Sequence, residues 1–186
     1  MTVAIILIVA ILLLAGFFVV GFNKLRTQDV QVNEALGGID VQLTRRADLI
    51  PNLVNTVKGY AQHEKGVFEA VTEARAGVQK AAAGGTVEEK AAAEAALDKA
   101  IVNVLAVAEA YPELKASANF MELQEALTET ENQLSFARQY YNDAAATLNT
   151  SVSTIPWMFF AGIAGVSKKE FYKAPEGSTA PPTVQF

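Results

Sequence analysis

Hydrophobic positions follow two different patterns in the first part of the chain. Residues 3–22 carry no charge and are mostly Val, Ile, Leu or Phe. After them, apolar residues recur in two rows with a spacing of seven, which together make one apolar stripe along a helix. The first row is Leu25, Val32, Ile39, Arg46, Leu53, Tyr60, Val67 and Ala74, and the second is Leu36, Leu43, Ile50, Val57, Glu64, Val71 and Val78. The pattern predicts an uncharged segment that continues into one long amphipathic helix, as far as about Lys80.

The uncharged segment has the length of a membrane span. As a helix it would reach about 30 Å, the thickness of the hydrocarbon core, and its insertion would be favourable by about −5 to −9 kcal/mol. A cleaved signal peptide is the alternative, but it needs a basic region before the apolar stretch and a small-residue cleavage site after it. Lys24 and Arg26 follow the segment and no Lys or Arg precedes it. The positive-inside rule therefore predicts an outer N-terminus and a cytoplasmic remainder.

The predicted membrane span and the helices after it divide the chain into three parts. We expect a transmembrane anchor over residues 1–23, a cytoplasmic helical bundle over residues 24–172 and a disordered tail over residues 173–186, where proline and polar residues dominate. Pro51 lies inside the first long helix, but the apolar rows keep step across it, which favours a kinked, continuous helix. Gly37-Gly38 predicts either a close approach of another backbone or local bending.

Two further amphipathic helices follow. Gly84-Gly85 indicates a turn, Thr86 is a plausible N-cap, and a second helix extends to about Ala110. Its apolar face consists of Leu97, Ile101, Val104, Leu105 and Ala108. Tyr111-Pro112 breaks it, and a third helix runs from Phe120 to about Ser151. This pattern predicts an all-α fold, an antiparallel bundle with long helices. A fourth helical layer would come from the two halves of the first helix about Pro51, or from the C-terminal segment.

A short apolar run, residues 157–166, follows Ile155-Pro156 and precedes Lys168-Lys169. It is too short to cross a bilayer as a helix. Two interpretations remain open. The run packs on the bundle, as short apolar runs usually do, or it lies in the membrane interface with its aromatic side chains in the lipid boundary and the lysines at the headgroups.

Composition excludes several kinds of chemistry. The chain has 186 residues, no cysteine, one histidine and a net charge of −5, so a thiolate site and a nucleic-acid partner lack support. His63 is not part of a zinc motif, because Val67 stands where the second histidine would be, nor of a di-iron site, because Tyr60 stands where glutamate is needed. We find no phosphate loop, nucleophile elbow or triad. We therefore expect no enzyme, no catalytic residues, no cofactor and no metal site.

Arg46 occupies a position in the apolar row, beside Arg45 and Asp48. A buried arginine needs partners. The candidates on the third helix are Glu129, Glu131 and Asn132. Arg138, seven residues beyond Glu131, is placed to join the same network. The favoured interpretation is a polar layer that fixes helix register, and the alternative is an anion-binding site. The first predicts that Arg46→Ala destabilises the domain more than Arg75→Ala.

These positions also carry a resemblance to a known family. Residues 39–54, IDVQLTRRADLIPNLV, and residues 57–64, VKGYAQHE, are the most specific stretches. Shorter matching stretches are residues 74–75, 109–116, 119–120, 128–132, 138, 141–142 and 161–171. In these stretches the chain resembles the LemA family, although Val166 stands where phenylalanine is expected.

The resemblance implies a bacterial, single-pass protein of the cytoplasmic (inner) membrane, with a short outer N-terminus and a cytoplasmic helical bundle, and it does not imply an enzyme. A relative belongs to the machinery that shapes magnetosome membranes, which suggests membrane organisation. The first functional hypothesis is a self-assembling scaffold, a homo-oligomer that meets the lipid bilayer through its anchor and forms coiled-coil contacts along its long helix. The alternative is a membrane-tethered adaptor that binds a soluble partner through an exposed helix face.

Overall fold

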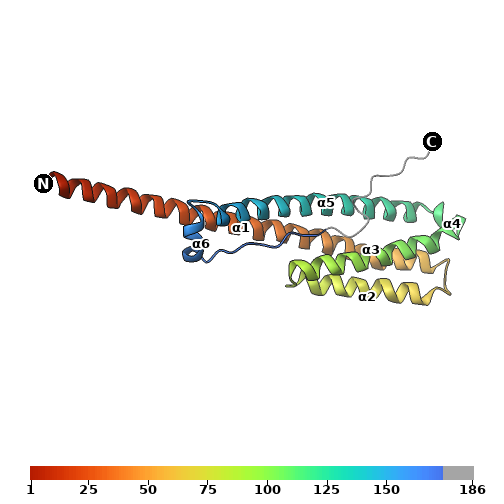
Figure 1. Cartoon of the computed structure of the whole chain (residues 1–186). Coiled ribbons are helices and arrows are strands. Elements are labelled where there is room, and N and C mark those ends of the chain that lie inside the picture. The colour runs from red at the N-terminus through yellow and green to blue at the C-terminus, as the bar shows by residue number, and fades with distance from the viewer. Residues whose placement is uncertain (174–186) are drawn as a thin grey trace, which may run out of the picture. The chain divides into compact units, whose positions relative to one another are not determined.

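The computed structural model describes residues 1–173, and within them every regular element is a helix, which confirms the all-α class (Figure 1). The helices are α1 (Thr2–Lys58), α2 (Lys65–Ala82), α3 (Val87–Glu109), α4 (Pro112–Lys115), α5 (Ala118–Ser153) and α6 (Met158–Ala164). Of the tail expected over residues 173–186, only Lys173 is described, and it belongs to no helix. Residues 174–186 lie outside the described part.

The described residues form two compact units. The stem unit contains residues 1–36 and 140–171, and the bundle unit contains residues 37–139 with Tyr172 and Lys173. Helices α1 and α5 each contribute residues to both units.

Helix α1 continues through Pro51, as the unbroken rows predict, but it ends at Lys58. The prediction of one helix as far as Lys80 is therefore wrong. Residues 59–64 form a turn, and the two row positions within it, Tyr60 and Glu64, are exposed. The spacing resumes at the buried Val71 and Val78 because α2 carries the same period on a separate helix. The stripe of apolar residues is thus shared between two helices.

The glycine pair of α1 does not mark a close contact. A Cβ added at Gly37 or Gly38 would meet nothing within 4 Å. The close approach of another backbone, one of the two interpretations of this pair, is therefore wrong. Along α1, the stem unit ends at Leu36 and the bundle unit begins at Gly37, so the glycine pair lies at this boundary.

In the bundle unit, α2 supplies the fourth helix beside parts of α1, α3 and α5 (Figure 1). The fourth layer thus comes from the second part of the predicted first helix, but the break lies at residues 59–64 and not at Pro51. Helices α2 and α3 lie side by side and are joined by a tight turn. Thr86 caps α3 as predicted: its hydroxyl accepts a hydrogen bond from Glu89 N at 3.2 Å, and the Glu89 carboxylate accepts one from Thr86 N at 2.8 Å. The core of the unit includes Leu43, Ile50, Leu53, Val57, Phe68, Val71, Val78, Leu97, Ile101, Val104, Leu127 and Leu134.

In the stem unit, the end of the described chain returns along α5. The Tyr141 hydroxyl donates to Glu170 O at 2.8 Å, and the Asn149 side chain bonds both Lys169 N and Lys169 O, at 2.8 and 2.9 Å. Lys169 also pairs with Asp29 of α1 at 2.7 Å. Val166, the departure from the resembled pattern, is buried. These contacts hold residues 166–171 against the two long helices.

Helix α6 packs on α1 within the stem unit, next to the C-terminal end of the uncharged segment (Figure 1). The run 157–166 therefore packs on a long helix, as the first interpretation expects, but its ring and cation–π contacts lie at residues 17–24 of α1. The interfacial interpretation stays a prediction. Helix α1 is long and apolar enough to cross a membrane, and none of its most apolar 18-residue window is buried.

Candidate functional site: a buried charge network and an aromatic cluster

Helices α1, α3 and α5 bring five charged side chains together in the bundle unit, and a tyrosine completes the set. We call this set the charge network. It consists of Arg46, Glu94, Asp98, Glu131, Arg138 and Tyr172.

Arg46 is buried, as its row position predicts, and it faces two carboxylates. It hydrogen-bonds Glu131 of α5, one of its three predicted partners, and its Nη1 lies 2.5 Å from Asp98 Oδ1. The Asp98 contact is an ion pair without hydrogen-bond geometry. The other two candidates do not join: the Glu129 carboxylate accepts a hydrogen bond from Gln133 at 2.8 Å, and Asn132 is exposed.

Arg138 links α5 to α3 and joins the network as predicted. One of its guanidinium nitrogens contacts Glu94, and the other donates to Glu131 Oε1 at 2.9 Å. The second Glu94 oxygen accepts a hydrogen bond from the Tyr172 hydroxyl at 2.6 Å. Glu94 is fully buried, so its charge depends on these two partners for stabilisation. Because Arg46 and Arg138 both contact Glu131, this carboxylate joins the two halves of the network.

The network has three carboxylates for two guanidiniums, and burial acts on its protonation. Burial raises the pKa of Glu94 to about 7, although the Tyr172 hydrogen bond and the Arg138 charge act in the opposite direction. Burial also raises the pKa of Asp98, against the effect of Arg46. Burial and the neighbouring Glu94 raise the pKa of the Tyr172 hydroxyl, so this group stays a donor. Glu94 is therefore the group that takes up a proton near neutral pH.

The geometry of the network bears on two kinds of ligand, a cation and an anion. The oxygens of Glu94, Asp98 and Glu131 lie within 4.8 Å of one another, which is a spacing that a cation can bridge. Each carboxylate, however, already faces a guanidinium, so a metal ion would have to displace an arginine contact. The same pairing argues against an anion site, because both guanidiniums are engaged. The geometry favours a polar layer that fixes which helices pair.

Sequence reasoning missed Glu94, Asp98 and Tyr172. The signal for Glu94 was present, because Glu94, Ile101 and Ala108 are spaced by seven on the buried face of α3. Lys90 interrupts the neighbouring row in the same way; it is buried, and its Nζ lies 2.5 Å from Asp40 and 3.1 Å from Ala81 O. Tyr172 follows the last helix, where no periodic pattern places it.

The remaining polar residues singled out from the sequence lie outside the network. His63 is exposed in the turn between α1 and α2, and Arg45 is exposed on α1. Arg75 donates through Nε to Ala47 O at 3.1 Å and lies 4.0 Å from the exposed Asp48. None of the three approaches the burial of Arg46.

The stem unit contains a different kind of cluster, made of Phe17, Phe18, Trp157 and Phe160, which we call the aromatic cluster. The Phe17 ring stacks on Trp157 at 6.0 Å between centroids, and Phe160 meets Phe17 and Phe18 edge-on at 5.4 and 5.8 Å. The Lys24 ammonium lies 4.2 Å from the centre of a Trp157 ring, within the range of a cation–π contact. Gly21 leaves room for the cluster, since a Cβ there would lie 2.7 Å from the Phe160 ring.

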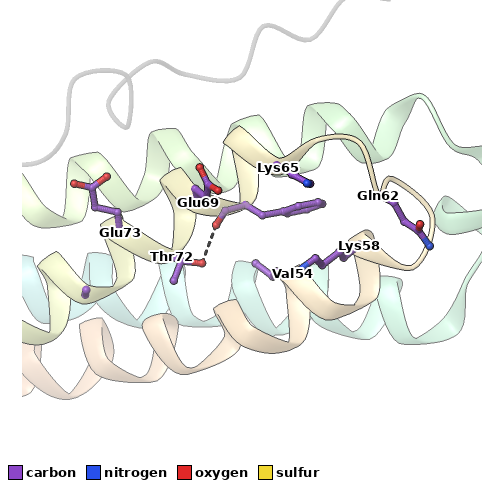
Figure 2. Close-up of a pocket in the computed structure, with 9 residues that line it drawn as sticks. Val54, Lys58, Gln62, Lys65, Glu69, Thr72 and Glu73 are labelled. Carbon is purple, nitrogen blue, oxygen red and sulfur yellow. Dashed lines mark hydrogen bonds between the residues drawn. The ribbon is translucent and has the colours of Figure 1, made fainter.

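The bundle unit also carries an open groove between α1 and α2. Figure 2 shows Val54 and Lys58 on α1 facing Lys65, Glu69 and Thr72 on α2. Phe68 and Ala76 add apolar lining, and Gln62 lies in the turn that joins the two helices. The groove therefore has apolar walls with charged groups of both signs, a surface that suits a protein segment better than a small ionic ligand.

Comparison with known proteins agrees with this architecture. Residues 35–186 match the family model described as the LemA family. Magnetosome proteins MamQ 1 and MamQ 2 of Paramagnetospirillum magneticum are each 23% identical over 182 aligned residues, which cover 85% of this chain and 67% of the relative. Magnetosome protein MamQ of Magnetospirillum gryphiswaldense is 22% identical, with the same coverage of this chain and of the relative. Since the family match covers most of the sequence, including the whole bundle unit, the chain belongs to the LemA family.

Proposed function

We propose that this protein is a bacterial single-pass membrane protein that assembles with copies of itself into a scaffold on the membrane. One observation carries the proposal. Helix α1 contains the uncovered apolar window and also residues such as Leu43, Leu53 and Val57, which are buried in the bundle unit. The element that enters the bilayer is thus also a wall of the folded bundle.

The aromatic cluster supports an anchor that is retained and not cleaved. Removal of the uncharged segment would take away Phe17, Phe18 and Gly21, which are the partners of Trp157 and Phe160. Those two large aromatic side chains would then lose their packing, at a cost of several kcal/mol. The contacts therefore support retention of the anchor in the mature protein.

The pairing of the buried charges and the presence of exposed apolar side chains support a self-assembling scaffold and not an enzyme. In the charge network each carboxylate faces a guanidinium, and these pairs join α1, α3 and α5. Outside it, Val102 on α3 and Met121 and Phe136 on α5 are more than half exposed. Anchors inserted in parallel bring the same faces of neighbouring copies together, so such side chains are available for contacts between copies. The relatives are magnetosome proteins by name, which is consistent with a role at a membrane-bound structure.

Assembly is tested on the full chain extracted in a mild detergent. Mass photometry and negative-stain imaging are expected to show particles of several copies. Phe136→Ser is expected to lower the copy number, whereas Gln139→Ser, an exposed polar change on the same helix, is expected to leave it unchanged. A monomer at every concentration would contradict the proposal.

The proposed orientation places the N-terminus outside and the C-terminal part in the cytoplasm of the bacterial inner membrane. It is supported by Lys24 and Arg26 directly after the uncharged segment. Reporters that are active only in the cytoplasm or only in the periplasm, fused to the C-terminus, test it. Activity of the cytoplasmic reporter alone is expected, and activity of the periplasmic one would refute the orientation.

The groove between α1 and α2 favours a second candidate function, a membrane-tethered adaptor that binds a soluble protein (Figure 2). A photo-crosslinking residue in place of Thr72, compared with one in place of Phe136, distinguishes the two functions in cells. Crosslinks between copies favour the scaffold. One dominant foreign protein, captured from position 72 and not from position 136, would favour the adaptor.

A further inference from the structure

Helix α6 is apolar on both of its faces. Phe160 and Ala164 are buried, Phe160 against Phe17 and Phe18 of α1, whereas Phe159 and Ile163 on the outward side are 66% and 63% exposed. Ile155, just before the helix, is also exposed. A helix on a water-facing surface normally presents polar residues outward. The outer face of α6 therefore needs an apolar partner that the described chain does not supply.

The aromatic cluster fixes the level of α6 along α1. Its contacts on α1 run from Phe17 to Lys24, across the point where the uncharged segment ends at Phe22. At 1.5 Å per residue, Phe17 lies about 7 Å inside that end. Interfacial helices bury their apolar faces roughly 5–10 Å into the boundary between headgroups and acyl chains. The two depths agree.

The chain segments before and after α6 fix its position along α1. Helix α5 ends at Ser153, shortly before α6 begins at Met158. After α6, the chain is bound to α5 through Tyr141 to Glu170 and through Asn149 to Lys169. Helix α6 is thus held beside Phe17 and Phe18 of α1, which are 44% and 39% exposed and belong to the uncharged segment.

We propose that α6, with Trp157, is an interfacial membrane helix whose Phe159–Ile163 face lies among the lipid acyl chains next to α1. The inference goes beyond the proposed function but rests on the insertion of α1. Trp157 then lies at the depth that tryptophan prefers, and Lys24 and the exposed Lys168 lie at the level of the headgroups. The protein contacts one leaflet through two segments that are far apart in its sequence.

The chain offers its own probe, because Trp157 is its single tryptophan. The full chain is reconstituted into phosphatidylcholine vesicles that carry bromine at a shallow, middle or deep position of the acyl chains. Trp157 fluorescence is expected to be quenched most by shallow bromine and least by deep bromine. Phe159→Ser combined with Ile163→Ser is expected to cause a loss of this quenching, whereas Phe136→Ser, in the bundle unit, is expected to leave it unchanged.

A second reporter separates this inference from the anchor itself. In the variant Leu13→Trp with Trp157→Phe, the probe lies about 14 Å inside Phe22 and is expected to be quenched most by deep bromine. If this probe is quenched and Trp157 is not, the inference on α6 is overturned and the anchor stands. If neither is quenched, both are overturned. Quenching of Trp157 that appears only when the protein is diluted in the membrane would show that a second copy covers α6, and would also overturn the inference.

Discussion

The two units of the protein differ in where they place charged and apolar side chains. In the bundle unit the charged side chains of Arg46, Glu94 and Arg138 are buried, the most exposed of them at 7%. In the stem unit Leu12, Leu13 and Leu14 are 65–69% exposed, and no charge occurs near them. Charges are inside one unit, and large hydrophobic side chains are outside the other.

The difference is what we expect if residues 3–22 are surrounded by lipid and the bundle unit is surrounded by water. A buried charge is tolerated only when it is paired, and every charged member of the charge network has at least one oppositely charged partner within ion-pair distance. A continuous exposed apolar surface is not stable in water and marks a contact with lipid or protein. The bundle unit therefore has the organisation of a helical bundle with a paired polar layer, and residues 3–22 of the stem unit have the length and composition of a membrane span.

The largest effect is expected from breaking the charge network at Arg138. Arg138→Ala leaves Glu94 buried with the Tyr172 hydroxyl as its remaining partner in the network, and is expected to lower the free energy of unfolding by about 3–5 kcal/mol. Arg46→Ala should cost less, because water reaches its partners Asp98 and Glu131. Arg75→Ala should cost less than about 1 kcal/mol. Thermal melting of the full chain in nanodiscs measures this order.

A double variant tests the reason for that loss. Arg138→Met with Glu94→Leu removes both charges and keeps the volume, so it should be more stable than Arg138→Ala alone. Equal melting temperatures for Arg138→Ala and Arg75→Ala would show that the network contributes nothing to folding.

The next effect is a dependence of stability on pH. The folded protein raises the pKa of Glu94 to about 7 from an ordinary value of 4.5. Between these values the folded state holds a proton that the unfolded chain has released, so stability falls as pH rises through this window, by about 3 kcal/mol. Glu94→Gln should flatten this fall relative to the unmodified chain in denaturant titrations from pH 4.5 to 8. Parallel curves would contradict the assignment.

A smaller effect is expected at Tyr172. Tyr172→Phe removes the hydroxyl that donates to Glu94 at 2.6 Å, and is expected to cost about 1–2 kcal/mol. Tyr60→Phe is the control, because Tyr60 is exposed in the turn after α1 and should change stability very little. A loss of the same size in both variants would show that the Glu94 contact has no special weight.

The smallest effect on overall stability is expected at Gly21, where the change is local to the stem unit. A side chain at Gly21 would collide with the Phe160 ring, whereas a Cβ at Gly16 would meet nothing within 4 Å. Gly21→Leu should therefore displace α6 and shift the emission of Trp157, and Gly16→Leu should not. The same emission in both variants would argue against the packing of α6 on α1.

The helical class, the helix across Pro51 and the partnership of Arg46 with Glu131 were predictable from the sequence, because each depends on a period of seven within one helix or on a lone charge in an apolar row. The end of α1 was missed because α2 keeps the same period. Gly59 and the polar Glu64 were the available warnings. Tyr172 and the contact of α6 with α1 were not predictable, since they depend on how a segment without periodicity returns along the helices.

The most direct test of the account uses the absence of cysteine in the chain. Single cysteines are placed at Leu12 and at Val102, which have almost the same exposure, 65% and 62%. Native membranes, opened so that both faces are accessible, are treated with a water-soluble maleimide. The account predicts that the cysteine at position 102 reacts and that the one at position 12 reacts only after the membrane is dissolved. Equal labelling before that step, or a purified protein that lacks position 12, would contradict it.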